Sequence, residues 1–269
     1  MGKELHIYLR TLRMHLLAGL EYKGWWFMVL QVLFVCVTDP LGTILMFHRF
    51  GGIGSWTLER ILLIYALALT SFGLAESCCR GLDYFPEHML RTGGFDRLLL
   101  RPRSLLVQIA ASFFHIHRLA RPVAGTALIF WALGRLDVVL TPVTLCLLVF
   151  ALIGGLLTYI GVFVMSAGIA FFTIRAMDWV YIFTNASYQI TRIPQEHMPL
   201  PLKQLFTFFM PMLVVAYYPA ATICGWSEGV PIWASGWAGW LALPAGAAFL
   251  GFSIYIWRYG LRHYQSTGS

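Results

Sequence analysis

The chain alternates long apolar runs with short charged segments, and the lengths of these runs predict membrane-spanning helices. About 20 apolar residues at 1.5 Å per residue cross the roughly 30 Å hydrocarbon core of a bilayer. Six spans are expected, over the approximate ranges 24–47, 58–78, 119–136, 138–174, 176–193 and 237–257. The predicted fold class is therefore all-α and integral to the membrane, with residues 1–269 forming one transmembrane domain.

One apolar run is longer than a single crossing requires. Residues 138–174 carry no charged side chain, so they form either one long tilted helix or two short helices broken near Gly154-Gly155. We expect one helix, because glycine is tolerated inside membrane helices.

Prolines interrupt the run at 204–227. Pro211 and Pro219 each lack a backbone donor, which costs roughly 3 kcal/mol or more in a helix interior. Two such breaks predict short re-entrant helices that dip in from the outer side, within the region 194–228. Together with Trp226, the two prolines are expected to form an outer gate.

The N-terminal residues have the pattern of a helix that lies on the membrane surface. In residues 1–23, leucines recur on one helical face, while Lys3, Arg10 and Arg13 fall largely off it. Such a helix binds the headgroup region of an anionic leaflet. A second in-plane helix is expected over 104–117.

Residues 80–103 form the most charged block and predict a loop with one or two short helices. Apolar side chains alternate there with charges, as in a helix that inserts into a groove of a partner protein. The candidate coupling residues are Phe85, Met89, Leu90, Phe95, Asp96, Arg97 and Arg101.

Composition supports the membrane assignment and excludes a soluble protein. Hydrophobic residues make up 59 %, charged residues 12 %, and the mean hydropathy is +0.72, whereas a soluble domain has about 25 % charged residues. The net charge of +7 is scattered between apolar runs, so no nucleic-acid partner is expected. Lysine and arginine are in excess on the side of both termini, which places the termini and the 80–103 block in the cytoplasm. Arg118 and Arg121 are expected to snorkel to that interface.

Polar side chains inside the spans are candidate functional groups. On the fifth span they form one stripe, made of Tyr181, Asn185, Tyr188, Gln189 and Arg192. The stripe either lines a substrate path or holds helices together by hydrogen bonds. Asp39, beside Pro40, is either a coupling or gating site or a solvated carboxylate near the outer surface.

The sequence lacks the motif of a self-powered pump and carries no motif of a membrane enzyme in its expected context. A P-loop lysine precedes Ser or Thr, but Lys3, Lys23 and Lys203 precede Glu4, Gly24 and Gln204. No HExxH pattern occurs, and the GxSxG run at 225–229 lacks the strand before it that a nucleophile elbow needs. His115-x-His117 has no nearby carboxylate in the sequence. We therefore expect no catalytic residue, metal or bound cofactor in this chain.

Several motifs together resemble one transporter family. They are the runs 54–59, 71–76, 94–102 (GFDRLLLRP) and 118–121 (RLAR), Gln108, Pro211, and the runs 217–220 and 260–269. This pattern is similar to that of ABC-2 type permease subunits, in the bacterial branch long catalogued as a domain of unknown function. The 94–102 run and the YxSTGS tail are its most specific parts.

The resemblance implies an N-terminal connector helix, six spans, a coupling helix after the second span and re-entrant helices before the sixth, as in type V exporters. It also implies two cytoplasmic ATPase subunits that hold ATP and Mg²⁺, and a second permease, identical or homologous, in the bacterial inner membrane. The substrate would be amphipathic, lipid-linked or drug-like, and would move outward. The alternatives are a non-transporting structural or regulatory subunit, an ion-coupled carrier and, third, a membrane enzyme.

Overall fold

The computed structural model describes residues 2–21, 23–50, 56–173, 184, 187–226 and 236–264, and these residues are predominantly helical. The main helices are α1 (Gly2–Glu21), α2 (Trp25–Thr38), α3 (Leu41–Phe50), α4 (Leu58–Phe85), α5 (Gly94–Leu99), α6 (Leu105–Ala111), α7 (Ala120–Arg135), α8 (Pro142–Thr173), α10 (Leu200–Gln204), α11 (Tyr218–Cys224) and α12 (Ala242–Arg262). Short turns of other helix types join them: η1 (Pro86–Leu90), η2 (Ile116–Leu119), η3 (Gln195–His197), η4 (Leu205–Phe209), η5 (Leu213–Tyr217) and η7 (Ala238–Leu241).

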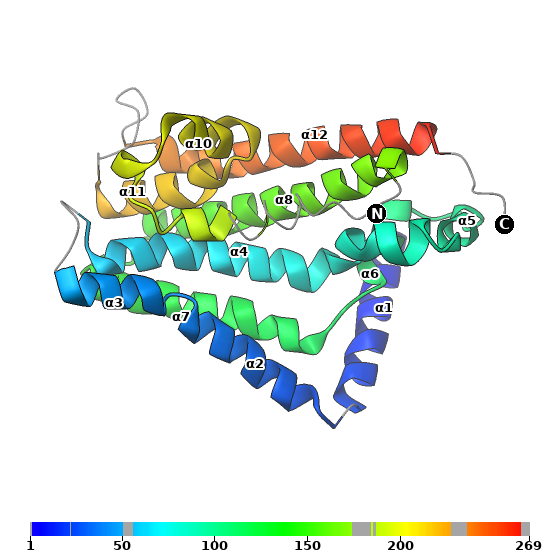
Figure 1. Ribbon diagram of the computed structural model, residues 1–269, viewed down its shortest axis with the longest axis horizontal. Helices are drawn as coiled ribbons and strands as arrows, with labels where there is room; N and C mark the ends of the chain where they lie inside the picture. Colours follow the sequence, from blue (N-terminus) through cyan, green and yellow to red (C-terminus); the bar gives the residue numbers. More distant parts are fainter. Residues whose placement is uncertain are drawn as a thin grey trace.

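The long helices form an elongated bundle around α4, which is buried along most of its length (Figure 1). α5 lies at one end of this bundle and α11 at the other (Figure 1). We call these the α5 end and the α11 end. α4 and α8 run in the same direction, since Phe72 contacts Tyr159 and, further along both helices, Phe85 contacts Phe171.

α7 runs antiparallel to α4, and glycines bring the two helices together. A Cβ at Gly73 would lie 2.7 Å from Pro122, and one at Gly125 would lie 2.3 Å from the Thr70 hydroxyl. Gly125 follows Pro122 along α7, whereas its partner Thr70 precedes Gly73 along α4, so the two helices run in opposite directions. Small residues at a helix contact let the backbones approach closely, which is the main source of packing between helices in a membrane.

α8 and α12 meet along a seam of small residues spaced seven apart. Gly154, Gly161 and Gly168 on α8 lie opposite Gly246, Ser253 and Gly260 on α12. A Cβ at Gly246 would lie 2.2 Å from the Gly154 carbonyl oxygen, and a Cβ at Gly260 would lie 2.4 Å from that of Gly168. The pairs follow the same order along both helices, so α8 and α12 are parallel. The single-helix prediction for residues 138–174 is confirmed over Pro142–Thr173.

Two boundaries differ from the sequence-based prediction. The first span divides at Asp39-Pro40 into α2 and α3, because proline cannot donate the hydrogen bond that would continue the helix. The second span continues past Cys78 to Phe85, since Leu82 and Phe85 still face the core. Ion pairs along α4 allow this extension into the charged block: Arg80 lies 3.3 Å from both Glu76 and Asp83.

α4 bends at Cys79, whose φ of −131° is outside the helical range. The Tyr8 hydroxyl of α1 donates to the Cys78 carbonyl at 2.6 Å. α1 is therefore attached to the bundle at the point where α4 departs from regular geometry. The in-plane helix predicted over 104–117 is shorter than expected, because α6 ends at Ala111 and η2 follows.

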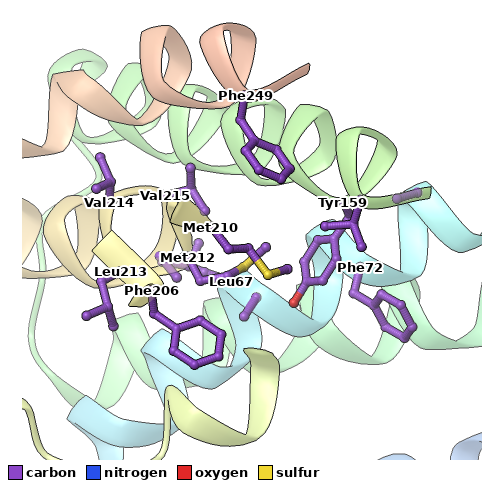
Figure 2. Close-up of a cluster of buried hydrophobic side chains, with 14 of the residues drawn as sticks. Leu67, Phe72, Tyr159, Phe206, Met210, Met212, Leu213, Val214, Val215 and Phe249 are labelled. Carbon is purple, nitrogen blue, oxygen red and sulfur yellow. The ribbon is translucent and has the colours of Figure 1, made fainter. Parts of the chain in front are cut away.

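The proline-rich segment turns sharply at Pro211. The helical runs Leu200–Phe209 and Leu213–Cys224 meet at 79°, and the flanking Met210 and Met212 are buried in the same cluster as Leu67 and Tyr159 (Figure 2). Pro219 was expected to cause a second break, and this prediction is wrong. The π-helical turn η5 precedes it, and the Tyr218 N–H donates to the Leu213 carbonyl. The helix therefore continues although Pro219 has no N–H to donate.

Within the described residues, four helical stretches are long and apolar enough to cross a membrane: Trp25–Arg49, Leu58–Leu90, Pro142–Thr173 and Ala238–Arg262. The bent pair could supply a fifth. α7 matches the predicted third span within one residue at each end but has only 16 residues. Most of the predicted fifth span, 176–193, lies outside the described residues.

Candidate functional site

The 80–103 block is anchored to the bundle by aromatic side chains. Phe85 of α4 and Phe95 of α5 are fully buried and meet edge to face, with ring centroids 5.2 Å apart. Both rings also contact Phe171 of α8 at 5.5 Å. Trp257 and Tyr264 join from α12 and the residues that follow it. The loop between the second and third spans is thus connected to the ends of three helices.

The apolar members of the block pack within this chain, and their role in coupling stays a prediction. Phe85, Leu90 and Phe95 were expected to insert into a partner, but they are buried in this chain's own core, and Met89 packs against the same core. A short helix has too little contact area to stay folded alone, so its apolar side chains hold it to the bundle.

The charged members of the block point outward or cap this cluster. Arg97 and Arg101 are exposed. The Tyr264 hydroxyl donates to the Asp96 carboxylate at 2.9 Å. Burial, together with the Asp96 carboxylate, raises the pKa of Tyr264 to about 12. Arg97 and Arg101 therefore remain available to a partner, whereas Asp96 has an internal role.

Asp39 lies at the centre of a polar cluster, where α2 ends. Its carboxylate accepts hydrogen bonds from Tyr65 at 2.9 Å, Gln189 at 3.0 Å and Arg192 at 2.5 Å. Arg192 also donates to the Asp39 backbone carbonyl at 2.6 Å, and its guanidinium lies 4.2 Å from the centre of the Tyr65 ring. The solvated-carboxylate interpretation is therefore wrong, because Asp39 joins α2, α4 and the segment before α10.

The predicted polar stripe is only partly within the described residues. Gln189 and Arg192 both bind Asp39, and Tyr188 stacks on Phe72 with ring centroids 5.7 Å apart. These three side chains hold helices together, as the hydrogen-bond alternative expects. Tyr181 and Asn185 lie outside the described residues.

Another polar cluster surrounds Glu76, which is buried in α4. Arg118 and Arg121 each donate to one of its carboxylate oxygens, and Arg80 lies 3.3 Å away. Arg118 also donates to the Tyr84 hydroxyl at 3.1 Å. Both guanidinium groups, which were expected to snorkel to the interface, bind the buried Glu76 carboxylate of this chain.

Sequence reasoning did not find this cluster as a site, although a signal was present. Glu76 is an acidic residue near the end of an apolar run, and such a group needs a partner within the membrane. Arg118 and Arg121 are three residues apart and so lie on one face of the chain as it enters α7. Burial and the adjacent Arg118 lower the pKa of His117, which directly precedes the run 118–121 that holds both arginines.

The expected outer-gate residues lie near the α11 end. Trp226 packs against Trp56 with ring centroids 6.4 Å apart, and the Arg60 guanidinium lies 4.9 Å from the Trp226 ring centre. Pro211 is buried at the 79° bend and Pro219 lies inside a helical run. Trp226 and the bend are thus packed against the start of α4. None of these contacts tests a gating role.

A metal site needs several His, Cys, Asp or Glu side chains close together. In the part of the chain that the structure describes, no three such side chains lie close enough together to hold a metal ion. The polar clusters are ion pairs between helices, which suit a membrane scaffold.

Comparison with known proteins identifies the family. The family model described as an ABC-2 family transporter protein matches residues 33–268, which is most of the chain. No curated protein and no solved structure matched the chain. With several apolar helices and a family match that spans them, the chain belongs to the ABC-2 transporter family, as a transmembrane permease.

Proposed function

We propose that the chain is the permease subunit of an ATP-driven exporter whose ATPase subunits are separate proteins. The family match over residues 33–268 carries this proposal. The absence of a P-loop lysine from the sequence agrees with it, because ATP must then be hydrolysed elsewhere. By family resemblance, two ATPases and a second permease complete the transporter, and an amphipathic, lipid-linked or drug-like substrate moves outward.

The direction of the helices supports a six-span topology with both termini in the cytoplasm. α8 and α12 are parallel, so the chain between them must return once from the α5 end to the α11 end. The fifth span expected from the sequence, 176–193, would account for this return. If the bent pair also crossed, α12 would point the opposite way. The bent pair at 200–224 is therefore proposed to be re-entrant at the outer side.

The exposed charges beside α5 are the proposed contact with the ATPase. Arg97 and Arg101 point away from a block that is fixed to the bundle by Phe85 and Phe95. A rigidly held block with free charges can bind a partner and transmit a displacement. Asp39 has structural partners on two other segments, which weakens the ion-coupled carrier alternative.

The test is affinity purification in detergent, with ATP turnover measured on the purified complex. We expect a stoichiometric ATPase, and turnover that depends on this chain. Arg97→Glu with Arg101→Glu should detach or uncouple the ATPase while the permease stays in the membrane. Arg135→Glu, an exposed arginine at the opposite end of α7, is the matched control.

Unchanged co-purification and turnover in the double variant would overturn the docking proposal. Failure of the wild-type chain to retain any ATPase would instead favour a non-transporting structural or regulatory subunit.

A further inference from the structure

A cavity of about 320 Å³ lies between α2 and the start of α7, beside the Glu76 cluster. One wall is a face of α2, made of Met28, Gln31, Val32 and Val35. The opposite wall carries His117, Arg118 and Arg121, with Glu76 behind them. The cavity is thus apolar on one side and cationic on the other.

A second cavity of about 250 Å³ adjoins the first, and the two share Met28 and His117 as lining residues. Its other walls come from the end of α1, the start of α2 and the residues before η2: Gly19, Trp25, Phe114, His115 and Ile116. These walls are mainly apolar. The two cavities therefore form one site with a cationic part and an apolar part.

The cationic part has more positive than negative charge. Among the charged residues that line the first cavity, Arg118 and Arg121 face one carboxylate, Glu76, which leaves one positive charge in excess on the cavity wall. Charges interact more strongly in these partly buried surroundings than in water, so the excess charge acts on an anion that enters the cavity. The cluster therefore favours an additional anionic group.

The arginine side chains also have unused donors. A guanidinium offers five N–H groups, and Arg118 uses its two terminal nitrogens on Glu76 and Tyr84. Its Nε is buried and has no acceptor among the residues that the structure describes. That Nε is out of reach of a ligand, so an oxygen-rich anion in the cavity would be bound by the remaining N–H groups on the terminal nitrogens of the arginines.

From this geometry we propose that the site between α2 and α7 binds an amphipathic molecule with an anionic, phosphate-like headgroup. The headgroup lies against Arg118 and Arg121, and the apolar part lies beside Met28 in the second cavity. A soluble anion would gain nothing from the apolar walls, and an uncharged amphipath would leave the excess charge unmatched. The inference does not depend on the proposed transport function, because binding requires neither ATP nor an ATPase.

The test measures binding to the full-length chain in detergent by native mass spectrometry. The probes are phosphatidylglycerol and phosphatidylcholine with the same acyl chains, and inorganic phosphate alone. We expect phosphatidylglycerol to bind at least about tenfold more tightly than phosphatidylcholine, which corresponds to ~1.4 kcal/mol. Inorganic phosphate should not displace it. Equal binding of the two lipids, or displacement by phosphate, would overturn the proposal.

Variants locate the site. Arg121→Gln should reduce the preference for phosphatidylglycerol to less than about twofold, while Arg135→Gln, on an exposed arginine at the other end of α7, should keep it. Because Arg121→Gln also removes an ion pair with Glu76, a second variant leaves the arginines intact. Met28→Trp fills the junction of the two cavities and should weaken phosphatidylglycerol binding. Full binding by both Arg121→Gln and Met28→Trp would place the lipid elsewhere and refute the assignment.

Discussion

Replacing Gly246 with alanine tests whether close approach of α8 and α12 stabilises the bundle. The new Cβ would lie 2.2 Å from the Gly154 carbonyl oxygen, where ordinary contacts begin at 3.4 Å. The helices must therefore separate by roughly 1 Å in a close-packed interior. Overpacking of this kind costs about 1–3 kcal/mol, although alanine regains up to ~1 kcal/mol of helix propensity.

Gly251→Ala is the matched control, because it lies on the same helix and a Cβ there would meet nothing within 4 Å. The gain in helix propensity is common to both variants, so the difference between their stabilities reports the contact with α8. At about 2–4 °C per kcal/mol for a chain of this size, the cost of about 1–3 kcal/mol should make Gly246→Ala melt roughly 2–12 °C below Gly251→Ala.

A thiol-reactive dye can follow unfolding of the detergent-purified chain. Cys36 is buried, and Cys78, Cys79 and Cys224 are half-buried, so they become reactive as the bundle opens. Exposed Cys146 contributes a constant background. Equal melting temperatures for the two glycine variants would refute the backbone contact between α8 and α12.

Three further predictions follow from the ion pairs and the topology. Exchanging the charges, with Asp39→Arg and Arg192→Asp together, should restore part of the thermal stability lost in either single variant; purely additive losses would show that the pair is not coupled. Glu76→Gln should lower stability by about 3–5 kcal/mol, because removing one member of a buried ion pair leaves the others uncompensated; an unchanged melting temperature would contradict this. A tag placed after Ser269 should be inaccessible from outside intact cells, and labelling from outside would overturn the six-span topology.

The sequence predicted the membrane class and most helix positions because these depend on local composition. α7 and α8 appear close to where their apolar runs lie. The direction of individual side chains was less predictable. Phe85 and Phe95 have the same local pattern whether they meet a partner or the chain's own Phe171, and only tertiary packing distinguishes the two cases.

The polar clusters show the same limit. Asp39 and Arg192 are far apart in the sequence, and no local pattern indicates that they meet. Glu76 was noted as part of a family motif, but its two arginine partners follow on another segment. The prediction for Pro219 failed because a π-helical turn precedes it and makes its missing N–H tolerable. Whether such a turn forms depends on the backbone of the preceding residues.

The aromatic cluster beneath α5 has a mechanical consequence. Phe95 touches Phe85 of α4 and Phe171 of α8, and both of those rings contact Trp257 of α12. A force applied to α5 would therefore act on three parallel helices at once. α2 lies outside this aromatic cluster and packs instead against α7 and η2. A displacement of α5 would reach α2 mainly through those two elements.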